Sequence, residues 1–400
     1  MAKKGQIVFK RHVFWWKVLL PVGWIASLVV HHKNGKHFKI KKGEQYIILS
    51  NHQTDLDPLL LGGMFNRPFC ILATDSFFSQ GLLVKMLRHV VGLIAKKKGT
   101  VDVSANMNMV KCMREGGSLL FYPEGNRTYA EFQFPLTEGF GKFIRYFKKP
   151  IIIVNTHGGT GCNPRWGKER RKGPYYTEIK RVIKPEEYEK YTDEEFEKIL
   201  ASELRVFDSE SGNLYKSDCK AEYLERMLFV CPKCGKLETL VSKGDHLTCT
   251  NCGLDVEYTE DLHLASKDKE FKFIKLVDWY NFQLDYVKNY KLDDKVIFKD
   301  ENVELYISNP NSKRKLLVKG KLEMYKDKLV FEDKEIPVSD IDIASPISGT
   351  KFNFSTGEEN YLVIGSERFN PLKYVLMLHK VESRMKINNN DIYYSLERRN

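Results

Sequence analysis

The chain has 400 residues, and 42% of them are hydrophobic, which is enough for a packed core and excludes an intrinsically disordered protein. A chain of this length is expected to form two or three domains. Its 64 lysines and arginines outnumber its 52 aspartates and glutamates, and the net charge of +12 favours an anionic partner. Charge alone does not choose among nucleic acid, anionic lipid and small anionic substrates.

Residues 1–40 are predicted to contact a membrane. An apolar stretch at 13–30 contains three tryptophans and has basic residues on both sides. At about 1.5 Å per residue it reaches roughly 27 Å, just short of a hydrocarbon core of about 30 Å. Lys17 and Pro21 interrupt it. We therefore expect a helix or a kinked pair of helices in one leaflet, with the protein peripheral or monotopic at the cytoplasmic face; a buried core helix is the alternative.

From residue 41 to 207 strand and helix patterns alternate, which predicts an α/β domain with a mostly parallel sheet. Short apolar runs predict strands at 46–49, 69–73, 92–95, 118–121, 151–155 and 176–183. Helices are expected at 58–64, 81–90, 103–114 and 139–147, and a capping box at Thr192 and Glu195 begins a further helix that runs through Leu204.

The first of these strands leads into a candidate catalytic pair. Pro58 has a φ already suited to a helix, so Asp57 is predicted to be the N-cap. His52 and Asp57 would then meet across a strand-to-helix turn, where α/β sheets bind ligands. A carboxylate that fixes the tautomer of a neutral imidazole makes it a general base, worth roughly two to four powers of ten in rate. A loop histidine next to a capping aspartate is the alternative.

A second polar loop, Pro-Glu-Gly-Asn-Arg at 123–127, follows the strand at 118–121. Gly125 permits a backbone conformation that a side chain would forbid, and Arg127 offers a planar fork for phosphate oxygens. Glu124 is expected to orient Arg127 or to accept from a substrate hydroxyl. A solvated turn with an exposed ion pair is the alternative interpretation of this loop.

The order and spacing of these segments resemble the 1-acylglycerol-3-phosphate acyltransferase family of glycerolipid acyltransferases. The family signature is a histidine, four residues and an aspartate, followed by a Pro-Glu-Gly-x-Arg loop and by a proline that leads into an aliphatic strand, here 150–154. Between the first two blocks the family has a glycine with a phosphate-binding arginine six residues later; here these positions hold Gly92 and Lys98. The resemblance covers about residues 40–205, and its departures are Lys98 for arginine and Asn126 for threonine or serine.

This resemblance implies transfer of a fatty acyl group from acyl-CoA or an acyl carrier protein to 1-acyl-sn-glycerol-3-phosphate, which gives phosphatidic acid. It makes His52 the general base and Asp57 the residue that orients it. It assigns the acceptor's phosphate to four residues: Glu124, Gly125, Arg127 and Lys98. The acceptor hydroxyl attacks the thioester directly, so neither a covalent enzyme intermediate nor a metal is expected in the step. Glycerol 3-phosphate or another lysophospholipid is the alternative acceptor.

His157 follows the strand at 151–155 and is a rival catalytic histidine. It has no carboxylate beside it, so we predict a structural role.

Two C-x-x-C-G knuckles, separated by fourteen residues, predict a zinc ribbon at 226–258. Their cysteines form a closed site for a structural zinc: Cys231, Cys234, Cys249 and Cys252. The polar residues 208–225 before the ribbon are expected to form a linker. The remaining cysteines lack such spacing and are expected to be buried or incidental, without disulfides in an intracellular chain: Cys70, Cys112, Cys162 and Cys219.

After the ribbon, residues 265–293 are predicted to hold a connecting helix and residues 294–385 an all-β region, with a tail at 386–400. Period-two patterns predict strands at 303–307, 315–318, 322–325, 329–332, 334–337, 352–355 and 361–364. Asn370 is expected to cap a terminal helix that begins at Pro371. This order is similar to a pleckstrin-homology or GRAM-like barrel.

A non-catalytic zinc-ribbon protein that binds nucleic acid is the rival hypothesis. The segment between the knuckles lacks interleaved aromatic and basic side chains, so nucleic acid is not an expected partner.

Overall fold

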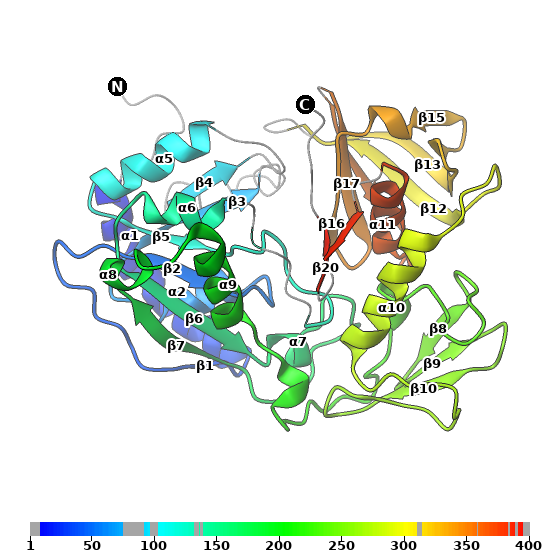
Figure 1. Ribbon diagram of the computed structural model, residues 1–400, viewed down its shortest axis with the longest axis horizontal. Helices are drawn as coiled ribbons and strands as arrows, with labels where there is room; N and C mark the ends of the chain where they lie inside the picture. Colours follow the sequence, from blue (N-terminus) through cyan, green and yellow to red (C-terminus); the bar gives the residue numbers. More distant parts are fainter. Residues whose placement is uncertain are drawn as a thin grey trace. The chain divides into compact units, whose positions relative to one another are not determined.

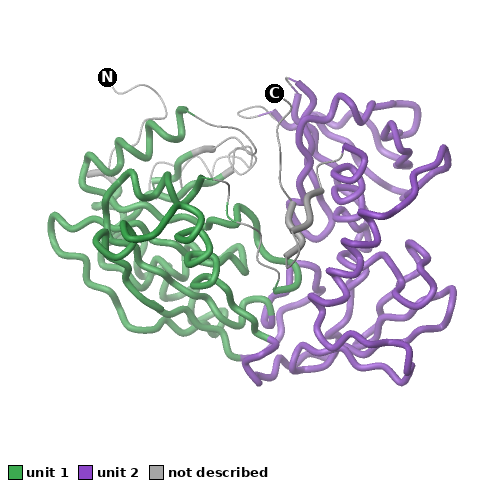
Figure 2. The backbone as a smooth tube through the Cα atoms, viewed as in Figure 1, with its two compact units in different colours: residues 1–160, 174–208 green, residues 161–173, 209–400 purple. Residues whose placement is uncertain are grey.

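The computed structural model divides the chain into two compact units (Figure 2). Unit 1 comprises residues 1–160 and 174–208, and unit 2 comprises residues 161–173 and 209–400. The expected domain at 41–207 is therefore interrupted, because its segment 161–173 belongs to unit 2. The structure describes residues 9–74, 92–96, 103–131, 136, 139–309, 314–357, 359–382, 385–388 and 391–394. The helix predicted at 81–90 and Lys98 lie outside these residues.

Unit 1 is built on a seven-stranded sheet with the order β1-β7-β6-β2-β5-β3-β4 (Figure 1). Its strands are β1 (Lys33–Asn34), β2 (Ile47–Ser50), β3 (Phe69–Thr74), β4 (Leu93–Lys96), β5 (Ser118–Phe121), β6 (Ile151–His157) and β7 (Tyr176–Ile183). The five neighbouring strands β6, β2, β5, β3 and β4 run parallel to one another, whereas β7 is antiparallel to β6. The predicted mostly parallel sheet is confirmed, and the carboxyl ends of β2 and β5 lie side by side.

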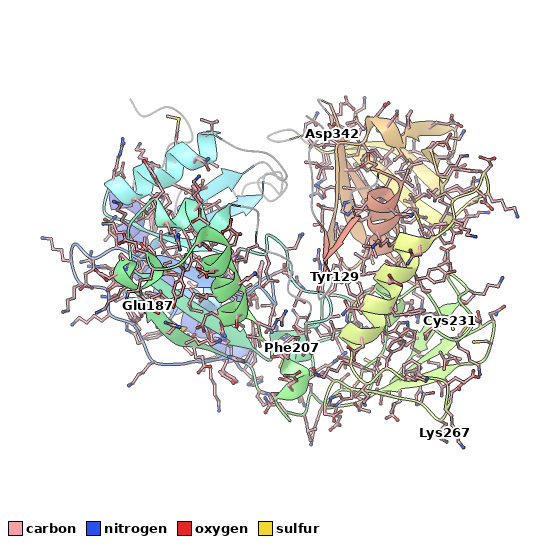
Figure 3. All side chains as sticks on the ribbon, viewed as in Figure 1. Tyr129, Glu187, Phe207, Cys231, Lys267 and Asp342 are labelled. Atoms are coloured by element: carbon pink, nitrogen blue, oxygen red, sulfur yellow. A yellow bond between two sulfur atoms is a disulfide. The ribbon has the colours of Figure 1, made fainter. Side chains whose placement is uncertain are left out.

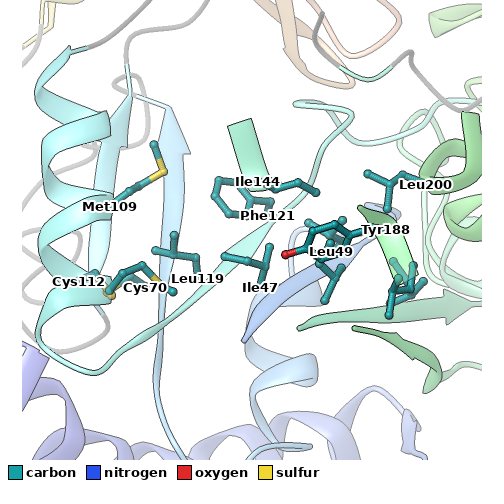
Figure 4. Packing of buried hydrophobic residues seen from close by; sticks show 14 of the residues in the cluster. Ile47, Leu49, Cys70, Met109, Cys112, Leu119, Phe121, Ile144, Tyr188 and Leu200 are labelled. Carbon is teal, nitrogen blue, oxygen red and sulfur yellow. A yellow bond between two sulfur atoms is a disulfide. The ribbon is translucent and has the colours of Figure 1, made fainter. Parts of the chain in front are cut away.

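Helices cover both faces of this sheet (Figure 1). They are α1 (Phe9–Val29), α2 (Asp57–Gly62), α5 (Val103–Arg114), α6 (Phe140–Arg145), α8 (Pro185–Tyr188) and α9 (Asp193–Leu204), with α7 (Gly159–Cys162) where the chain passes into unit 2. Ile47 and Leu49 of β2 pack with residues of α5, α6 and α9 (Figure 4). Ile48 packs on the other face with residues of α1 and α2. Strands buried on both faces explain the unbroken apolar runs in the sequence.

N-terminal caps were predicted for two helices of unit 1, and one of these predictions was wrong. The capping box of α9 is confirmed, because the Glu195 backbone N–H donates to Thr192 Oγ1 (3.2 Å) and the Thr192 N–H donates to Glu195 Oε2 (2.9 Å). Asp57, in contrast, is not the N-cap of α2, since that helix already includes it. Its carboxylate instead accepts hydrogen bonds from the preceding turn.

Cys70 and Cys112 form a disulfide between β3 and α5, with their Cα atoms 6.8 Å apart (Figure 4). The expectation that these two cysteines are unpaired was therefore wrong. Both are fully buried, as predicted, but their sequence separation of 42 residues carries no spacing signal. The β3–β5 pairing brings them together, because α5 leads directly into β5.

Unit 2 contains a small sheet and a large antiparallel one (Figure 1). The small sheet has the order β11-β10-β9-β8, made of β8 (Leu240–Lys243), β9 (His246–Cys249), β10 (Asp255–Tyr258) and β11 (Leu264–Ala265). Helix α10 (Leu276–Asn289) lies where the connecting helix was predicted.

The large sheet has seven antiparallel strands in the order β15-β14-β13-β12-β18-β17-β16. They are β12 (Phe298–Ile307), β13 (Lys315–Met324), β14 (Lys328–Phe331), β15 (Lys334–Pro337), β16 (Ile343–Ser348), β17 (Lys351–Thr356) and β18 (Glu359–Ile364). The strands predicted at 315–318 and 322–325 are one strand, β13, and β16 was not predicted. Helix α11 (Pro371–Val381) follows, and Asn370 caps it as predicted, since the Lys373 N–H donates to Asn370 Oδ1 (3.0 Å). A short hairpin, β19 (Met385–Asn388) and β20 (Asp391–Tyr394), lies in the expected tail.

Residues 208–225 are not the exposed linker that their polar composition suggested. Tyr215 is fully buried in unit 2, and so are Ala221 and Leu224. The Tyr215 ring packs so closely on Gly161 and Gly173 that a Cβ at either glycine would lie 2.4 Å from it. This contact between distant segments explains why 161–173 belongs to unit 2.

Candidate active site and candidate metal centre

His52 and Asp57 meet in the turn between β2 and α2, as predicted. Nδ1 of His52 lies 2.9 Å from Oδ2 of Asp57. The Asp57 side chain is fully buried, whereas 20% of the His52 side chain is exposed. A buried carboxylate on Nδ1 fixes the tautomer with its proton on Nδ1, so the lone pair lies on Nε2. No hydrogen bond to Nε2 is found among the residues that the structure describes.

The turn itself keeps Asp57 ionised. Oδ2 also accepts from the backbone N–H groups of Gln53 (2.7 Å) and Thr54 (2.9 Å), and Oδ1 accepts from the Thr54 hydroxyl (2.6 Å). Burial raises the pKa of Asp57, but the hydrogen bond and charge of His52 and the bonds from Thr54 outweigh it, and the pKa lies below its ordinary value. The carboxylate is therefore charged at neutral pH and able to stabilise an imidazolium.

Two distant residues complete the support behind Asp57, and neither was predicted. The buried Tyr175 hydroxyl lies 2.8 Å from Thr54 Oγ1 and donates to Asp57 Oδ1 at 3.3 Å. His32 packs edge-on against the Tyr175 ring, and its Nε2 lies 2.8 Å from Thr177 Oγ1. Burial lowers the pKa of His32 to about 4, partly countered by the charge of Asp57. His32 is thus neutral at physiological pH.

Tyr122 covers one face of the His52 imidazole. Its ring stacks on that of His52, with centroids 4.2 Å apart and planes inclined by 26°. Tyr122 follows β5 directly, so the neighbouring strands β2 and β5 deliver the two rings to the same edge of the sheet. Burial raises the pKa of Tyr122 well above its usual value, which keeps the ring neutral.

The loop after β5 lies against the His52 turn. The Thr128 N–H donates to the His52 carbonyl (3.0 Å), and Glu124 and Thr128 line a small pocket with His52. Gly125 has a φ of +65°, a conformation that favours glycine, as predicted. Arg127 forms an ion pair with Asp55, which lies in the His52 turn. The structure therefore brings the loop with Glu124, Gly125 and Arg127 against the turn that carries His52.

Two side chains of the His52 turn, Asn51 and Gln53, anchor this turn by hydrogen bonds to backbone groups. Asn51 donates to the Thr156 carbonyl and accepts from the Thr156 N–H, both at 2.8 Å, which joins the ends of β2 and β6. Gln53 Oε1 accepts from the Gly159 N–H (2.8 Å). Backbone-bonded side chains of this kind restrict the motion of the turn that carries His52.

His157 has a carboxylate beside it, contrary to the prediction. Its Nε2 lies 3.2 Å from Glu178 Oε1, and its ring stacks on Tyr176 with centroids 4.6 Å apart. The antiparallel β6–β7 register brings Glu178 and Tyr176 to this position. Because Glu178 is far from His157 in the sequence, the contact could not be predicted from sequence spacing. Burial lowers the pKa of His157, with the charge of Glu178 acting in the opposite direction. Half of the Glu178 side chain is exposed, so this pair lacks the buried, multiply bonded carboxylate of the His52 pair.

The four knuckle cysteines of unit 2 converge on one point. The sulfur atoms of Cys231, Cys234, Cys249 and Cys252 all lie within 4.8 Å of one another. Sγ of Cys231 is 3.6 Å from that of Cys252, and Sγ of Cys234 is 3.8 Å from that of Cys249. Four sulfurs around a tetrahedral zinc, at about 2.3 Å each, would lie about 3.8 Å apart. The donor set and its spacing fit zinc; Figure 3 labels Cys231, which precedes the small sheet.

Comparison with known proteins finds a similarity within unit 1. Residues 7–156 match the family model described as Acyltransferase. This segment is therefore similar to that family. The matched residues contain the His52 and Asp57 pair and the loop with Glu124, Gly125 and Arg127.

Two known proteins are similar to part of this chain. A 1-acyl-sn-glycerol-3-phosphate acyltransferase from Borreliella burgdorferi (strain B31) is 29% identical over 143 residues, which are 35% of this chain and 52% of that protein. This chain thus spans about half the length of that curated relative. The crystal structure of the 1-acyl-sn-glycerophosphate (LPA) acyltransferase PlsC from Thermotoga maritima is similar with a TM-score of 0.40 and 18% identity, covering 48% of this chain and 80% of that one.

Sequence reasoning missed several residues of the candidate site around His52 and Asp57. Thr54 and Asp55 lie between His52 and Asp57, and Tyr122 directly precedes the loop at 123–127. Their position in the sequence alone therefore indicated that they lie near the site. Tyr175 and His32 had none, because they lie 118 and 25 residues from Asp57 and reach it only through the fold.

Proposed function

We propose that the protein transfers a fatty acyl group from a thioester donor, acyl-CoA or acyl carrier protein, to the free hydroxyl of 1-acyl-sn-glycerol-3-phosphate, giving phosphatidic acid. The observation that carries this proposal is the 2.9 Å contact between His52 Nδ1 and the buried, ionised Asp57. The acyltransferase-family match and the name of the Borreliella burgdorferi relative support the choice of reaction and acceptor.

The pair handles one proton through the reaction. Nε2 of His52 takes the proton of the acceptor hydroxyl as its oxygen attacks the thioester carbonyl carbon, and Asp57 stabilises the imidazolium. The tetrahedral intermediate then collapses, the carbon–sulfur bond breaks, and the imidazolium returns the proton to the departing thiolate. The products are an ester and a free thiol, and no bond to the enzyme forms.

The loop after β5 is proposed to hold the acceptor. Arg127 binds the phosphate through its planar guanidinium, and Gly125 allows the turn that places it there. Glu124, which lines the pocket with His52, accepts from the acceptor's free hydroxyl. Lys98 is proposed as a further cation for the phosphate, by its position in the family motif alone.

A structural zinc is proposed for the four cysteines of unit 2. When bound, the metal would tie the two knuckles together without entering the transfer step, because four thiolates leave no open position for water or substrate. Gly235 and Gly253, with φ of +68° and +71°, let the N–H groups after each knuckle turn inward. A pleckstrin-homology-like or GRAM-like fold for the seven-stranded sheet and α11 is proposed by strand order alone.

The proposed site of action is the membrane surface. Helix α1 has 21 residues, about 31 Å, and is long and apolar enough to cross a membrane by length and composition. One face packs on the domain through the buried Trp16, whose Nε1 donates to the Phe65 carbonyl (3.1 Å). The opposite face leaves an apolar row exposed: Phe14, Val18, Val22, Ile25, Leu28 and Val29. A helix packed on one side and apolar on the other favours insertion into one leaflet over a span.

An acyl-transfer assay tests the proposal. The purified chain is supplied with acyl-CoA or acyl-carrier-protein donors and with lysophosphatidate, glycerol 3-phosphate or lysophosphatidylethanolamine as acceptors. We expect ester formation with lysophosphatidate and loss of activity in His52→Ala. Absence of transfer to every acceptor by a folded wild-type chain would refute it.

A further inference from the structure

The arginine proposed to bind the acceptor's phosphate is already engaged by a carboxylate of the same site. Arg127 Nη1 forms an ion pair with Asp55 Oδ2. The Arg127 side chain is 10% exposed and that of Asp55 is 78% exposed. The guanidinium is thus enclosed, and its carboxylate partner stands on the solvent side, where an acceptor would arrive.

The backbone on both sides holds this pair in register. Asp55 lies two residues before Asp57, in a turn whose Gln53 and Thr54 N–H groups donate to the Asp57 carboxylate. On the other side, the Thr128 N–H donates to the His52 carbonyl (3.0 Å), one residue after Arg127. The two partners are therefore presented by anchored loops, unlike most surface ion pairs, which join two flexible side chains.

A carboxylate and a phosphate compete for the same guanidinium, because each offers a pair of anionic oxygens that matches its fork of N–H groups. We propose that Asp55 is a specificity-determining residue, which holds Arg127 until the acceptor's phosphate displaces it. This inference rests on the proposed function. The displaced carboxylate remains beside the phosphate and repels a phosphate monoester, but it pairs with an ammonium if the headgroup carries one. Asp55 thus disfavours lysophosphatidate relative to a zwitterionic lysophospholipid.

The test is Asp55→Asn, which keeps the side chain's shape and removes its charge. We expect the KM for lysophosphatidate to fall about two- to fivefold, the size expected for a partly exposed ion pair. The donor's KM stays unchanged. The KM for lysophosphatidylethanolamine stays the same or rises, so the preference between the two acceptors shifts toward the monoester.

Two further variants isolate the Arg127 contact. Asp193→Asn makes the same charge change at an Asp–Arg pair with Arg145 in another part of unit 1, and it should leave both acceptor constants unchanged. In an Arg127→Ala background, Asp55→Asn should have no further effect on the acceptor's KM. An equal effect with and without Arg127 would assign the change to general electrostatics and overturn the inference.

A binding measurement separates this inference from the proposed function. Inorganic phosphate is titrated into wild type and Asp55→Asn and followed by ³¹P NMR, with no donor present. Tighter phosphate binding by Asp55→Asn supports the competition even if no acceptor is acylated, in which case the proposed function alone falls. Equal phosphate binding by the two proteins overturns the inference, whatever the transfer assay gives.

Discussion

The ring of Tyr122 stacks on the imidazole of His52, with 4.2 Å between centroids. Asp57 binds Nδ1 of that imidazole, and the stacked Tyr122 ring restricts the plane of the imidazole. A contact from the first residue of α2 and one from the residue that follows β5 thus orient Nε2, and precise orientation is worth much of a general base's effect.

Tyr122→Leu should lower kcat about tenfold while the thermal midpoint changes little, because a misaligned base reacts more slowly. Tyr122→Phe keeps the stack and should match wild type, since the Tyr122 hydroxyl has no hydrogen-bond partner among the described residues. Steady-state kinetics on both variants check this. A Tyr122→Leu enzyme as fast as wild type would contradict a role for the stack.

His52→Ala and Asp57→Asn should each lower kcat by roughly two to four powers of ten, because base and orienting carboxylate act as one unit. The double variant should be no worse than His52→Ala alone. Circular dichroism serves as the control for folding, since the side-chain amide introduced by Asp57→Asn retains an oxygen for the Gln53 and Thr54 N–H groups. Substantial transfer by folded His52→Ala would refute the mechanism.

The buried His32 predicts a loss of stability in mild acid. In the folded chain its pKa is about 4, whereas an unfolded histidine titrates near 6.5. Between these values the unfolded chain binds the extra proton, so the stability that is present above pH 6.5 is lost as the pH falls toward 4, by at most about 3 kcal/mol. Urea unfolding from about pH 7 to about pH 4.5 measures this slope. His32→Gln should flatten it, and the exposed His37→Gln should not; equal slopes in all three proteins would exclude His32 as the cause.

One zinc per chain should bind to the four cysteines, with loss of local folding when a chelator removes it, because binding and folding are coupled in such ribbons. Elemental analysis gives the stoichiometry. Cys234→Ser and Cys252→Ser should each lower the zinc content sharply, and Cys219→Ser, outside the cluster, should not. Full zinc content in a variant lacking all four cysteines would refute the ligand set.

The exposed row of α1 should carry the affinity for membranes. Replacing Val18 and Leu28, which are 51% and 75% exposed, with glutamate should weaken sedimentation with anionic vesicles at least about tenfold without unfolding the chain. Val241→Glu, at a 46% exposed apolar position in unit 2, is the matched control. Unchanged sedimentation of the α1 variant would remove α1 from the membrane contact.

The sequence by itself determined the features whose parts are close along the chain. His52 and Asp57 are five residues apart in one turn, each zinc knuckle spans four residues, and Asn370 caps a helix that begins at the next residue. Short-range geometry decides such contacts, so residue type and spacing sufficed. The parallel sheet was also predictable, because strands buried on both faces leave unbroken apolar runs.

Only the tertiary structure decided which distant side chains meet. Three contacts show this: Tyr175 with Asp57, 118 residues apart; Asp55 with Arg127, 72 residues apart; and His157 with Glu178, 21 residues apart. Each contact exists because the strands lie in the order β7-β6-β2-β5, and that order comes from packing the whole sheet. Strand order and register depend on contacts between segments far apart in the chain, which composition and local periodicity do not encode.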